Sequence, residues 1–388
     1  MTHPVRRVVL KIHFWSALLL GAWFVLLGLT GSALAFYLEI DEALNPQIQV
    51  GAPMAPPRSV EAIHQALRAA YPQRDGPWRI ELPLAPDMPV MARYNKPAER
   101  AGRHFAPLLV TLAPDTLQIT SSRFWGDTAM TWLYDLHYTL LLGKAGLTLV
   151  GIVGLVNAIM LATGIWLWWP SRARFLASLR IVPRHGAVRR AYDLHAAGGI
   201  YTFVVLIVLA LTGSALAFPD QAHAILASVS SPQVKPPTLV APGARPISLD
   251  DATVIAKRRF PDAEVRWIET SGARGTPISF RLYQPFEPSR RFPQTRIWLH
   301  PATGAILDVS DPYENRAGDT IMHWLHPLHN GEAFGTFGRC LICFVGLVPL
   351  LLFVTGIVRW RQKVRARRLR RVHLLQVAPQ RDALRSSA

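Results

Sequence analysis

The chain alternates between long apolar stretches and long polar segments. The apolar stretches are Phe14–Leu38, Ala145–Trp169, Ala196–Phe218 and Leu341–Trp360. An α-helix needs roughly 20 apolar residues to cross about 30 Å of hydrocarbon, and each stretch reaches that length. One such stretch would also suit a buried helix of a soluble protein, but four of them predict four transmembrane helices.

The two long polar segments each have the pattern of a small α+β module. Each opens with a serine at a helix N-cap position, followed by helical apolar spacing, at Ser59–Pro72 and at Ser248–Pro261. Short strand-like stretches follow in both segments. They are Trp78–Leu82, Pro89–Tyr94 and Leu108–Leu112 in the first, and Val265–Glu269, Ile278–Tyr283 and Arg296–His300 in the second. Segments rich in proline and glycine, Pro46–Pro57 and Ser231–Pro246, are expected to connect the modules to the helices.

The two halves of the chain repeat one another. The string LTGSALAF occurs at Leu29–Phe36 and again at Leu211–Phe218. At the same offset His13 aligns with His195, and at an offset ten residues longer His137 aligns with His329. We interpret this as a duplicated unit of helix, module and helix, whose copies share one orientation and are related by a pseudo-two-fold axis along the membrane normal.

The charge distribution predicts the topology. Half of the 388 residues are hydrophobic and 17% are charged, yet the formal net charge is +17. The basic excess lies before the first apolar stretch, between the second and third, and after the fourth. By the positive-inside rule these segments are cytoplasmic, so both termini are cytoplasmic and both modules periplasmic. We expect a multi-pass protein of the bacterial inner membrane, in contact with lipid, and not a nucleic-acid-binding protein.

The predicted fold is therefore a membrane α-helical bundle of four transmembrane helices, built from a duplicated two-helix unit, with two periplasmic α+β modules. The expected segments are 1–38 (N-terminus and first transmembrane helix), 39–131 (first module), 132–170 (second helix with its periplasmic approach), 171–192 (basic cytoplasmic loop), 193–218 (third helix), 219–322 (second module), 323–360 (fourth helix with its approach) and 361–388 (basic cytoplasmic tail).

Two local features have alternative interpretations. The first apolar stretch ends in Gly-Ser-Ala-Leu-Ala, which resembles a signal-peptide cleavage site, but the same string recurs in mid-chain, which favours an uncleaved helix. Cys340 and Cys343 form the string CLICF, in which Phe344 replaces the histidine that a c-type haem attachment site requires. We interpret the two cysteines as small apolar residues of a membrane helix.

Four histidines form two repeat-related pairs. His13 and His195 begin their helices on the cytoplasmic side, and His137 and His329 lie at the periplasmic approach to theirs. Two imidazoles that face each other at one depth suit the axial ligation of a b-type haem, because the iron takes one nitrogen from each side. The alternative is that these histidines lie at the membrane interface and bind lipid headgroups. The pairing across the repeat favours two bis-histidine haem b groups.

A neighbouring histidine cluster leaves one assignment open. His323, His326 and His329 are spaced by three in HWLHPLH, and Pro327 is expected to interrupt the helix there. Only His329 has a repeat partner, so it is the preferred ligand, with His326 in reserve and His323 a further alternative.

The combination of HFW…GLTGSALAF, LH…LLGKAG…ATGIWLWWP and LHNGEAFGTFGRC…TGIVRW resembles the PepSY-associated transmembrane family, also called iron-regulated membrane proteins. The resemblance covers nearly the whole chain, and the modules are similar to PepSY domains. Within the family, length and layout are most like FoxB-type siderophore-iron reductases. The resemblance implies an oxidoreductase that passes electrons across the membrane to a periplasmic ferric siderophore, with His13, His195, His137 and His329 matching the haem ligands.

The electron donor and two other functions stay open. The chain has no G-x-G-x-x-G after a strand, so electrons are expected from a separate cytoplasmic or quinol donor. One alternative function is a non-redox PepSY protein that binds or regulates a periplasmic partner. Another is a siderophore or metal transporter, which would need ionisable residues near mid-membrane.

Overall fold

The computed structural model describes residues 3–51, 54–180, 186–230, 247–272 and 275–386. The predicted connection Ser231–Pro246 and residues 181–185 of the predicted basic loop lie outside the described residues, as do the side chains of the tail from residue 370 onward. By its contacts the chain divides into two compact bodies. The helical body comprises Met1–Ser32, Ile152–Leu211 and Cys343–Ala388, and the sheet body comprises Ala33–Gly151 and Thr212–Ile342.

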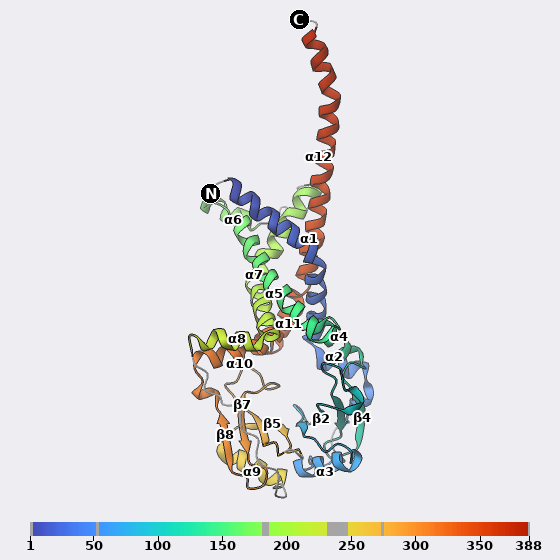
Figure 1. Cartoon of the computed structure of the whole chain (residues 1–388), viewed down its shortest axis with the longest axis vertical. Coiled ribbons are helices and arrows are strands. Elements are labelled where there is room, and N and C mark those ends of the chain that lie inside the picture. Colours follow the sequence, from blue (N-terminus) through green and yellow to red (C-terminus); the bar gives the residue numbers. More distant parts are fainter. Residues whose placement is uncertain (1–2, 52–53, 181–185, 231–246, 273–274, 387–388) are drawn as a thin grey trace. The chain divides into compact units, whose positions relative to one another are not determined.

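Four helices in the described part of the chain are long and apolar enough to cross a membrane: Pro4–Leu34, Gly143–Trp168, Arg189–Ala217 and Glu332–Leu369. They belong to α1 (His3–Leu34), α5 (Gly143–Trp168), α7 (Ala187–Ala217), and α11 (Gly335–Val345) followed by α12 (Val348–Ser386), as labelled in Figure 1. This confirms the four predicted spans. The first ends at Leu34, four residues earlier than predicted, because Phe36 adopts a non-helical conformation before α2 (Tyr37–Leu44).

Small residues allow close helix packing in the helical body. A Cβ built at Gly28 of α1 would lie 2.4 Å from the carbonyl oxygen of Gly346, between α11 and α12. A Cβ at Gly21 would lie 2.3 Å from the ring of Phe353. Ser32 donates a hydrogen bond of 2.8 Å to the carbonyl oxygen of Cys343. Membrane helices associate through such close contacts because lipid offers no hydrophobic driving force between them.

One eight-stranded antiparallel sheet dominates the sheet body, in the order β4-β3-β2-β1-β5-β6-β7-β8. The strands are β1 (Trp78–Glu81), β2 (Val90–Tyr94), β3 (Leu108–Leu112), β4 (Ile119–Phe124), β5 (Glu264–Glu269), β6 (Ile278–Tyr283), β7 (Thr295–Leu299) and β8 (Ile306–Ser310). The three predicted strands of each module are confirmed. The outer strands β4 and β8 were not predicted, because their sequences, ITSSRF and ILDVS, show no sustained alternation of apolar and polar residues.

The two modules share this sheet rather than forming separate ones. Strands β1 and β5 pair antiparallel, with Ile80 opposite Ile268. Each strand would otherwise be an exposed edge with unpaired backbone groups, and pairing satisfies them. The sequence alone does not indicate this pairing, since it depends on contact between residues almost 190 positions apart.

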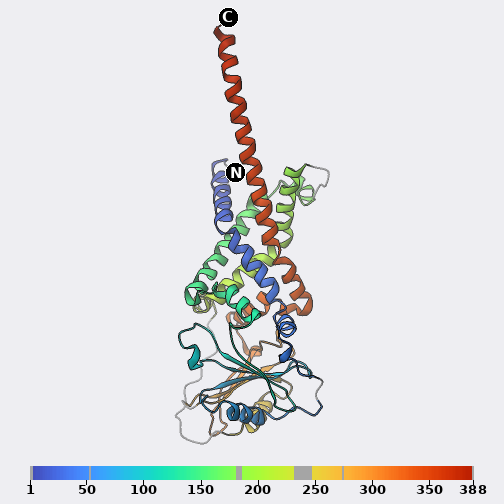
Figure 2. The same ribbon diagram turned by 90° about the vertical axis from the view of Figure 1, so that its right-hand side faces the viewer.

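Two helices cover one face of the sheet. Helices α3 (Val60–Ala70) and α9 (Leu249–Arg259) lie side by side on it, as Figures 1 and 2 show. The serines predicted as N-caps accept hydrogen bonds, Ser59 from the Ala62 amide and Ser248 from the Asp251 amide. The core beneath them is apolar and closed, formed by Leu67, Trp78, Ile80, Val110, Ile268, Phe280, Leu282, Ile297 and Leu299 among others.

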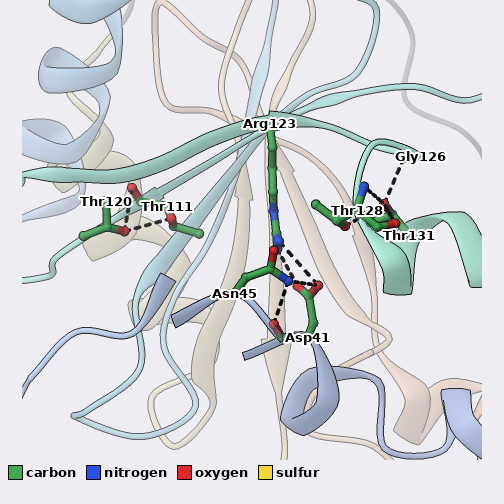
Figure 3. A network of polar contacts seen from close by, with 8 residues as sticks. All are labelled: Asp41, Asn45, Thr111, Thr120, Arg123, Gly126, Thr128 and Thr131. Carbon is green, nitrogen blue, oxygen red and sulfur yellow. Dashed lines mark hydrogen bonds and ion pairs between the residues drawn. The ribbon is translucent and has the colours of Figure 1, made fainter. Parts of the chain in front are cut away.

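The remaining helices of the sheet body are α2, α4 (Ala129–Thr139), α8 (Pro219–Ala227) and α10 (Ala317–Asn330). Figure 3 shows how α2 is attached: the Arg123 guanidinium of β4 pairs with the Asp41 carboxylate, which Asn45 also contacts. The same figure shows Thr128 and Thr131 forming the capping box that begins α4. A short α6 (Phe175–Ser178) lies in the helical body, and short 3-10 helices occupy Pro46–Ile48, Ala98–Arg100, Arg172–Arg174, Pro312–Glu314 and Glu332–Phe334.

The helices that carry His137 and His329 are separate from the apolar helices that follow them. Helix α4 ends at Thr139, and Leu140 and Leu141 have φ values of 51° and 60° before α5 begins. A Cβ at Gly146 would lie 1.6 Å from the Thr139 carbonyl oxygen, so the turn requires glycine there. The chain thus bends between α4 and α5. The expected break at Pro327 is wrong, because α10 continues through this proline to Asn330.

Candidate functional site

In the helical body, His195 of α7 is held through its Nδ1 atom. This nitrogen lies 3.1 Å from the Leu352 carbonyl oxygen and 3.0 Å from the Thr355 hydroxyl. A carbonyl oxygen only accepts hydrogen bonds, so Nδ1 carries the imidazole proton. The Thr355 hydroxyl already donates to the Leu351 carbonyl oxygen at 2.7 Å. The Nε2 atom of His195 therefore keeps its lone pair, which is the state that a metal requires.

His13 of α1 has the equivalent arrangement. Its Nδ1 atom lies 3.0 Å from the Thr163 hydroxyl, which itself donates to the Met160 carbonyl oxygen at 2.9 Å. Because the hydroxyl proton is used in that bond, the oxygen accepts from the His13 Nδ1–H. His13 therefore has the same tautomer as His195, with a free lone pair on Nε2.

Both histidines line one cavity of about 540 Å³ in the helical body. The volume lies within the range of about 300–1,000 Å³ typical of ligand and cofactor sites. Small residues keep the space open: a Cβ at Gly164 would lie 3.3 Å from the His13 Cε1 atom. Apolar side chains such as Phe24, Leu206 and Leu352 form much of the wall.

Four cationic side chains line the same cavity: Arg6, Arg7, Arg359 and Lys363. Arg6 donates to the Leu167 carbonyl oxygen at 3.1 Å, and the Arg359 guanidinium lies 4.5 Å from the centre of the Tyr192 ring. These contacts fix two of the cations in place. The cavity thus combines an apolar interior with basic groups that would pair with carboxylates of a bound ligand.

In the sheet body, His137 of α4 and His329 of α10 face each other. Their ring centres lie 6.2 Å apart, with 48° between the planes. A metal bound to one nitrogen of each ring at about 2.0–2.1 Å would separate the ring centres by roughly 6 Å, once the ring radii are added. The observed spacing therefore fits two imidazoles that share one metal ion.

The environment of His329 resembles that of His13 and His195. Its Nδ1 atom lies 3.0 Å from the Thr212 hydroxyl. A Cβ at Gly213 would lie 2.8 Å from the His329 Cε1 atom, so a larger residue here would displace the imidazole ring. Thr212 and Gly213 both belong to the repeated LTGSALAF string.

The two alternative histidines of α10 have the opposite tautomer. The Asn330 side-chain amide nitrogen faces His326 Nδ1 at 3.3 Å, and its orientation is set because its oxygen accepts from the Glu332 amide. Nδ1 of His326 is therefore an acceptor, and Nε2 carries the proton. Asn315 contacts His323 Nδ1 in the same way at 2.7 Å. His326 packs on Phe292, with ring centres 4.2 Å apart, whereas His329 packs on His137.

Burial keeps both of these histidines neutral. Desolvation lowers the pKa of His326 to about 3, with His329 and Arg291 acting in the same direction. Desolvation likewise lowers the pKa of His323 to about 4. Within the described residues no group of three or more histidine, cysteine or acidic side chains is placed to bind a metal ion. The candidate sites are therefore two histidine pairs.

The threonines that contact the histidines were not predicted as part of the site. The signal was present, because Thr163 and Thr355 are repeat-related and Thr212 lies in the repeated string. A histidine that binds a metal usually donates the N–H of its other ring nitrogen to a fixed acceptor. A threonine that recurs in both halves of the chain, as the histidines do, is therefore a candidate acceptor.

Four apolar helices long enough to cross a membrane and two pairs of half-buried histidines are typical of a multi-pass membrane protein with two candidate ligand sites. Comparison with known families agrees: residues 10–363 match the PepSY-associated TM region. The chain belongs to this family, which confirms the resemblance seen in its sequence motifs. No curated protein matches the chain.

Proposed function

We propose that this protein is a di-haem b oxidoreductase of the bacterial inner membrane, which passes electrons across the membrane to a periplasmic ferric siderophore. His13 and His195 would hold one haem, and His137 and His329 the other. The observation that carries the proposal is that three of these four histidines place Nδ1 3.0 Å from a threonine hydroxyl. When bound, haem b supplies a one-electron iron couple whose potential depends on its ligands and burial.

The residues around the histidines have defined tasks in this proposal. The threonine hydroxyls select the tautomer and fix the ring orientation, so that Nε2 is presented without reorganisation. Arg6, Arg7, Arg359 and Lys363 line the first cavity and would pair with the two propionate groups of haem b. The glycines beside the rings leave room for a flat macrocycle.

The proposal includes a duplicated unit and a topology. Equivalent pairs, His13 with Thr163 and His195 with Thr355, recur at the two repeat offsets, 182 residues for the histidines and 192 for the threonines, which supports duplication of a two-helix unit. The sheet order is also symmetric about the β1–β5 pair. Both termini would be cytoplasmic and the sheet body periplasmic, because the basic excess lies in the other segments. The electron donor would be a quinol or a separate cytoplasmic protein.

The test is a reduced-minus-oxidised visible spectrum of the purified protein, combined with haem quantification. We expect about two haems per chain with the spectrum of bis-histidine haem b. His13→Ala and His137→Ala should each lower the ratio toward one, whereas His223→Ala, at an exposed position on α8, should leave it unchanged.

Two results would contradict the proposal. A purified protein without haem would favour the non-redox binding function. A haem-loaded protein that ferric siderophore does not reoxidise after dithionite reduction would exclude the reductase activity.

A further inference from the structure

The face of the sheet opposite α3 and α9 is basic. Alternation along each strand places the arginines Arg79 (β1), Arg93 (β2), Arg281 (β6) and Arg296 (β7) on this face. The carboxylates that pair with them are Glu81 and Glu269. Cations therefore exceed carboxylates on a face where the arginine side chains are only partly exposed.

The excess of cations on this face shifts the pKa values of Arg281 and Glu269. Glu269 accepts from Arg79 at 2.5 Å, and its carboxylate also lies in the field of Arg281 and Arg296. Desolvation, together with the neighbouring cations Arg296 and Arg79, lowers the pKa of Arg281 to about 9. Like charges held at low solvent exposure repel each other, and an anion would relieve that repulsion.

A cavity of about 420 Å³ opens on this face, within the sheet body. Its lining includes four arginines, Arg79, Arg93, Arg266 and Arg291, and one carboxylate, Glu81. Arg79 and Arg266 are occupied by protein partners: Arg79 by Glu269, and Arg266 by Glu264 and by the carbonyl oxygens of Leu82 and Pro83. Arg93 and Arg291 are the two cations with weaker pairing.

The pairing of Arg93 is loose. Its Nη2 atom lies 3.3 Å from Glu81 Oε1, yet Glu81 Oε1 and Arg93 Nε are both buried without a hydrogen bond. The contact is an ion pair outside hydrogen-bond geometry. The guanidinium also lies 5.9 Å from the centre of the Trp125 ring, which keeps it in place.

Arg291 is held in a similar way. The Glu332 carboxylate is 3.8 Å away, while the guanidinium lies over the rings of Tyr37 at 5.5 Å and Phe292 at 5.0 Å. A guanidinium group that stacks on an aromatic ring is held in one orientation, while its N–H groups remain available as donors. Two of these N–H groups can donate in parallel to the two oxygens of a carboxylate.

Tyrosines complete the lining. Tyr37 of α2 lines the cavity, and burial raises its pKa, so its hydroxyl stays protonated and can donate. Tyr138 of α4 also lines the cavity, but its hydroxyl is hydrogen-bonded to the Asp135 carboxylate. Tyr134 and Tyr138 come from the helix that carries His137. The cavity therefore presents the Tyr37 hydroxyl and positive charge next to α4, the helix that carries His137.

We propose that this cavity binds a small anionic chelate rich in carboxylates, of the ferric citrate type, through Arg93 and Arg291. That the bound metal is iron rests on the proposed function; the anion binding itself does not. Hydroxamate chelates that carry a positive charge should be poor ligands, because they would meet uncompensated arginines in a partly desolvated site.

The test uses the full chain in detergent and gallium citrate, a redox-inert probe with the same metal charge as ferric citrate. We expect saturable binding by titration calorimetry that weakens as salt is raised. Arg291→Gln and Arg93→Gln should each weaken binding roughly tenfold to a hundredfold, because each removes a charged hydrogen-bonding fork. Glu81→Gln should strengthen binding, because it removes the carboxylate that competes for Arg93.

The matched control is Arg258→Gln, at an exposed position on α9 and on the other face of the sheet, which should bind as the wild type does. Two measurements need no variant: the salt dependence, and the comparison with the cationic chelate gallium desferrioxamine B. Equal or tighter binding of the cationic chelate, or unchanged binding by both arginine variants, would overturn the proposal. Arginine-dependent binding of gallium citrate by a haem-free protein would support the anion site and refute the reductase function. A haem-containing protein that does not bind gallium citrate would refute the anion site and leave the reductase function standing.

Discussion

At the scale of single residues, the choice between ligand and non-ligand histidines depends on hydrogen-bond partners. His13 and His195 face threonine hydroxyls that have already donated their proton, whereas His326 and His323 face side-chain amide donors. When the partner of Nδ1 accepts a hydrogen bond, Nδ1 carries the imidazole proton and Nε2 is free to bind a metal. When the partner donates, Nδ1 has the lone pair and Nε2 carries the proton. His329 faces the Thr212 hydroxyl, as His13 and His195 face theirs, whereas its two neighbours on α10 face side-chain amides.

The first prediction concerns the threonine partners. Thr163→Val removes the acceptor of the His13 Nδ1–H and should weaken haem retention at the first site by roughly ten- to a hundredfold, as for other lost partners of ligand histidines. Haem content after dilution and the midpoint potential are the measurements. Thr148→Val, an exposed threonine of α5 that bonds only its own helix backbone in the described contacts, is the control. A wild-type potential and haem content in Thr163→Val would refute the assigned role.

The second prediction concerns pH. The folded-state pKa of His326 is lowered to about 3, below the usual value near 6.5, so the unfolded chain binds this proton first. The stability linked to a neutral His326 is therefore complete above about pH 6.5 and decreases as pH falls toward 3. His326→Gln should lose less thermal stability than the wild type between pH 7.5 and 5, as measured by melting temperature. His223→Gln should follow the wild type, and equal pH slopes in His326→Gln and the wild type would contradict the prediction.

At the scale of elements, the helices and strands form where local pattern and capping agree. Ser59 and Ser248 cap α3 and α9, and reciprocal bonds join the starts of these helices: Glu61 accepts from the Leu249 amide, and Asp250 accepts from the Glu61 amide. Strands β4 and β8 lack such a local signal, since Ile119–Phe124 and Ile306–Ser310 mix polar and apolar residues without alternation. They become strands because β3 and β7 offer unpaired edges.

The third prediction concerns the attachment of α2. The side chains of Arg123 and Asp41 are only 9% and 5% exposed, and the pair joins β4 to α2. Asp41→Ala would leave a buried guanidinium without its carboxylate, which costs about 3–5 kcal/mol. We expect a clear drop in melting temperature in detergent. Asp127→Ala breaks the more exposed pair with Arg100 and should cost about 1 kcal/mol or less; equal losses in the two variants would show that burial does not set the difference.

At the scale of the whole molecule, charge separates the segments that join the apolar helices. The basic residues concentrate at the N-terminus, around residues 171–192 and after Trp360, while the sheet body contains most of the acidic groups. This asymmetry is the physical basis for the proposed orientation, because basic segments resist transfer across the inner membrane.

The fourth prediction tests this orientation. A fluorescent protein fused after Ala388 should fold and fluoresce, because it stays in the cytoplasm. Alkaline phosphatase inserted at Gly102, an exposed turn with a φ of 96° and open space around it, should be active, because it reaches the periplasm. An inactive phosphatase at Gly102 together with a dark C-terminal fusion would reverse the topology.

The amino-acid sequence by itself determined the four membrane-length apolar helices and six of the eight strands in the described residues, and it contains the repeated string and the two repeat-related histidine pairs. These features depend on local composition and periodicity, such as the apolar stretch Ala196–Phe218, or on identity between distant strings, such as the one shared by Leu29–Phe36 and Leu211–Phe218. Only the tertiary structure decided that the modules share one sheet, that threonines select the histidine tautomers, and that arginines gather around one cavity. Those features arise from contacts between residues far apart in the chain, and hydrophobic periodicity carries no information about which distant polar groups will meet.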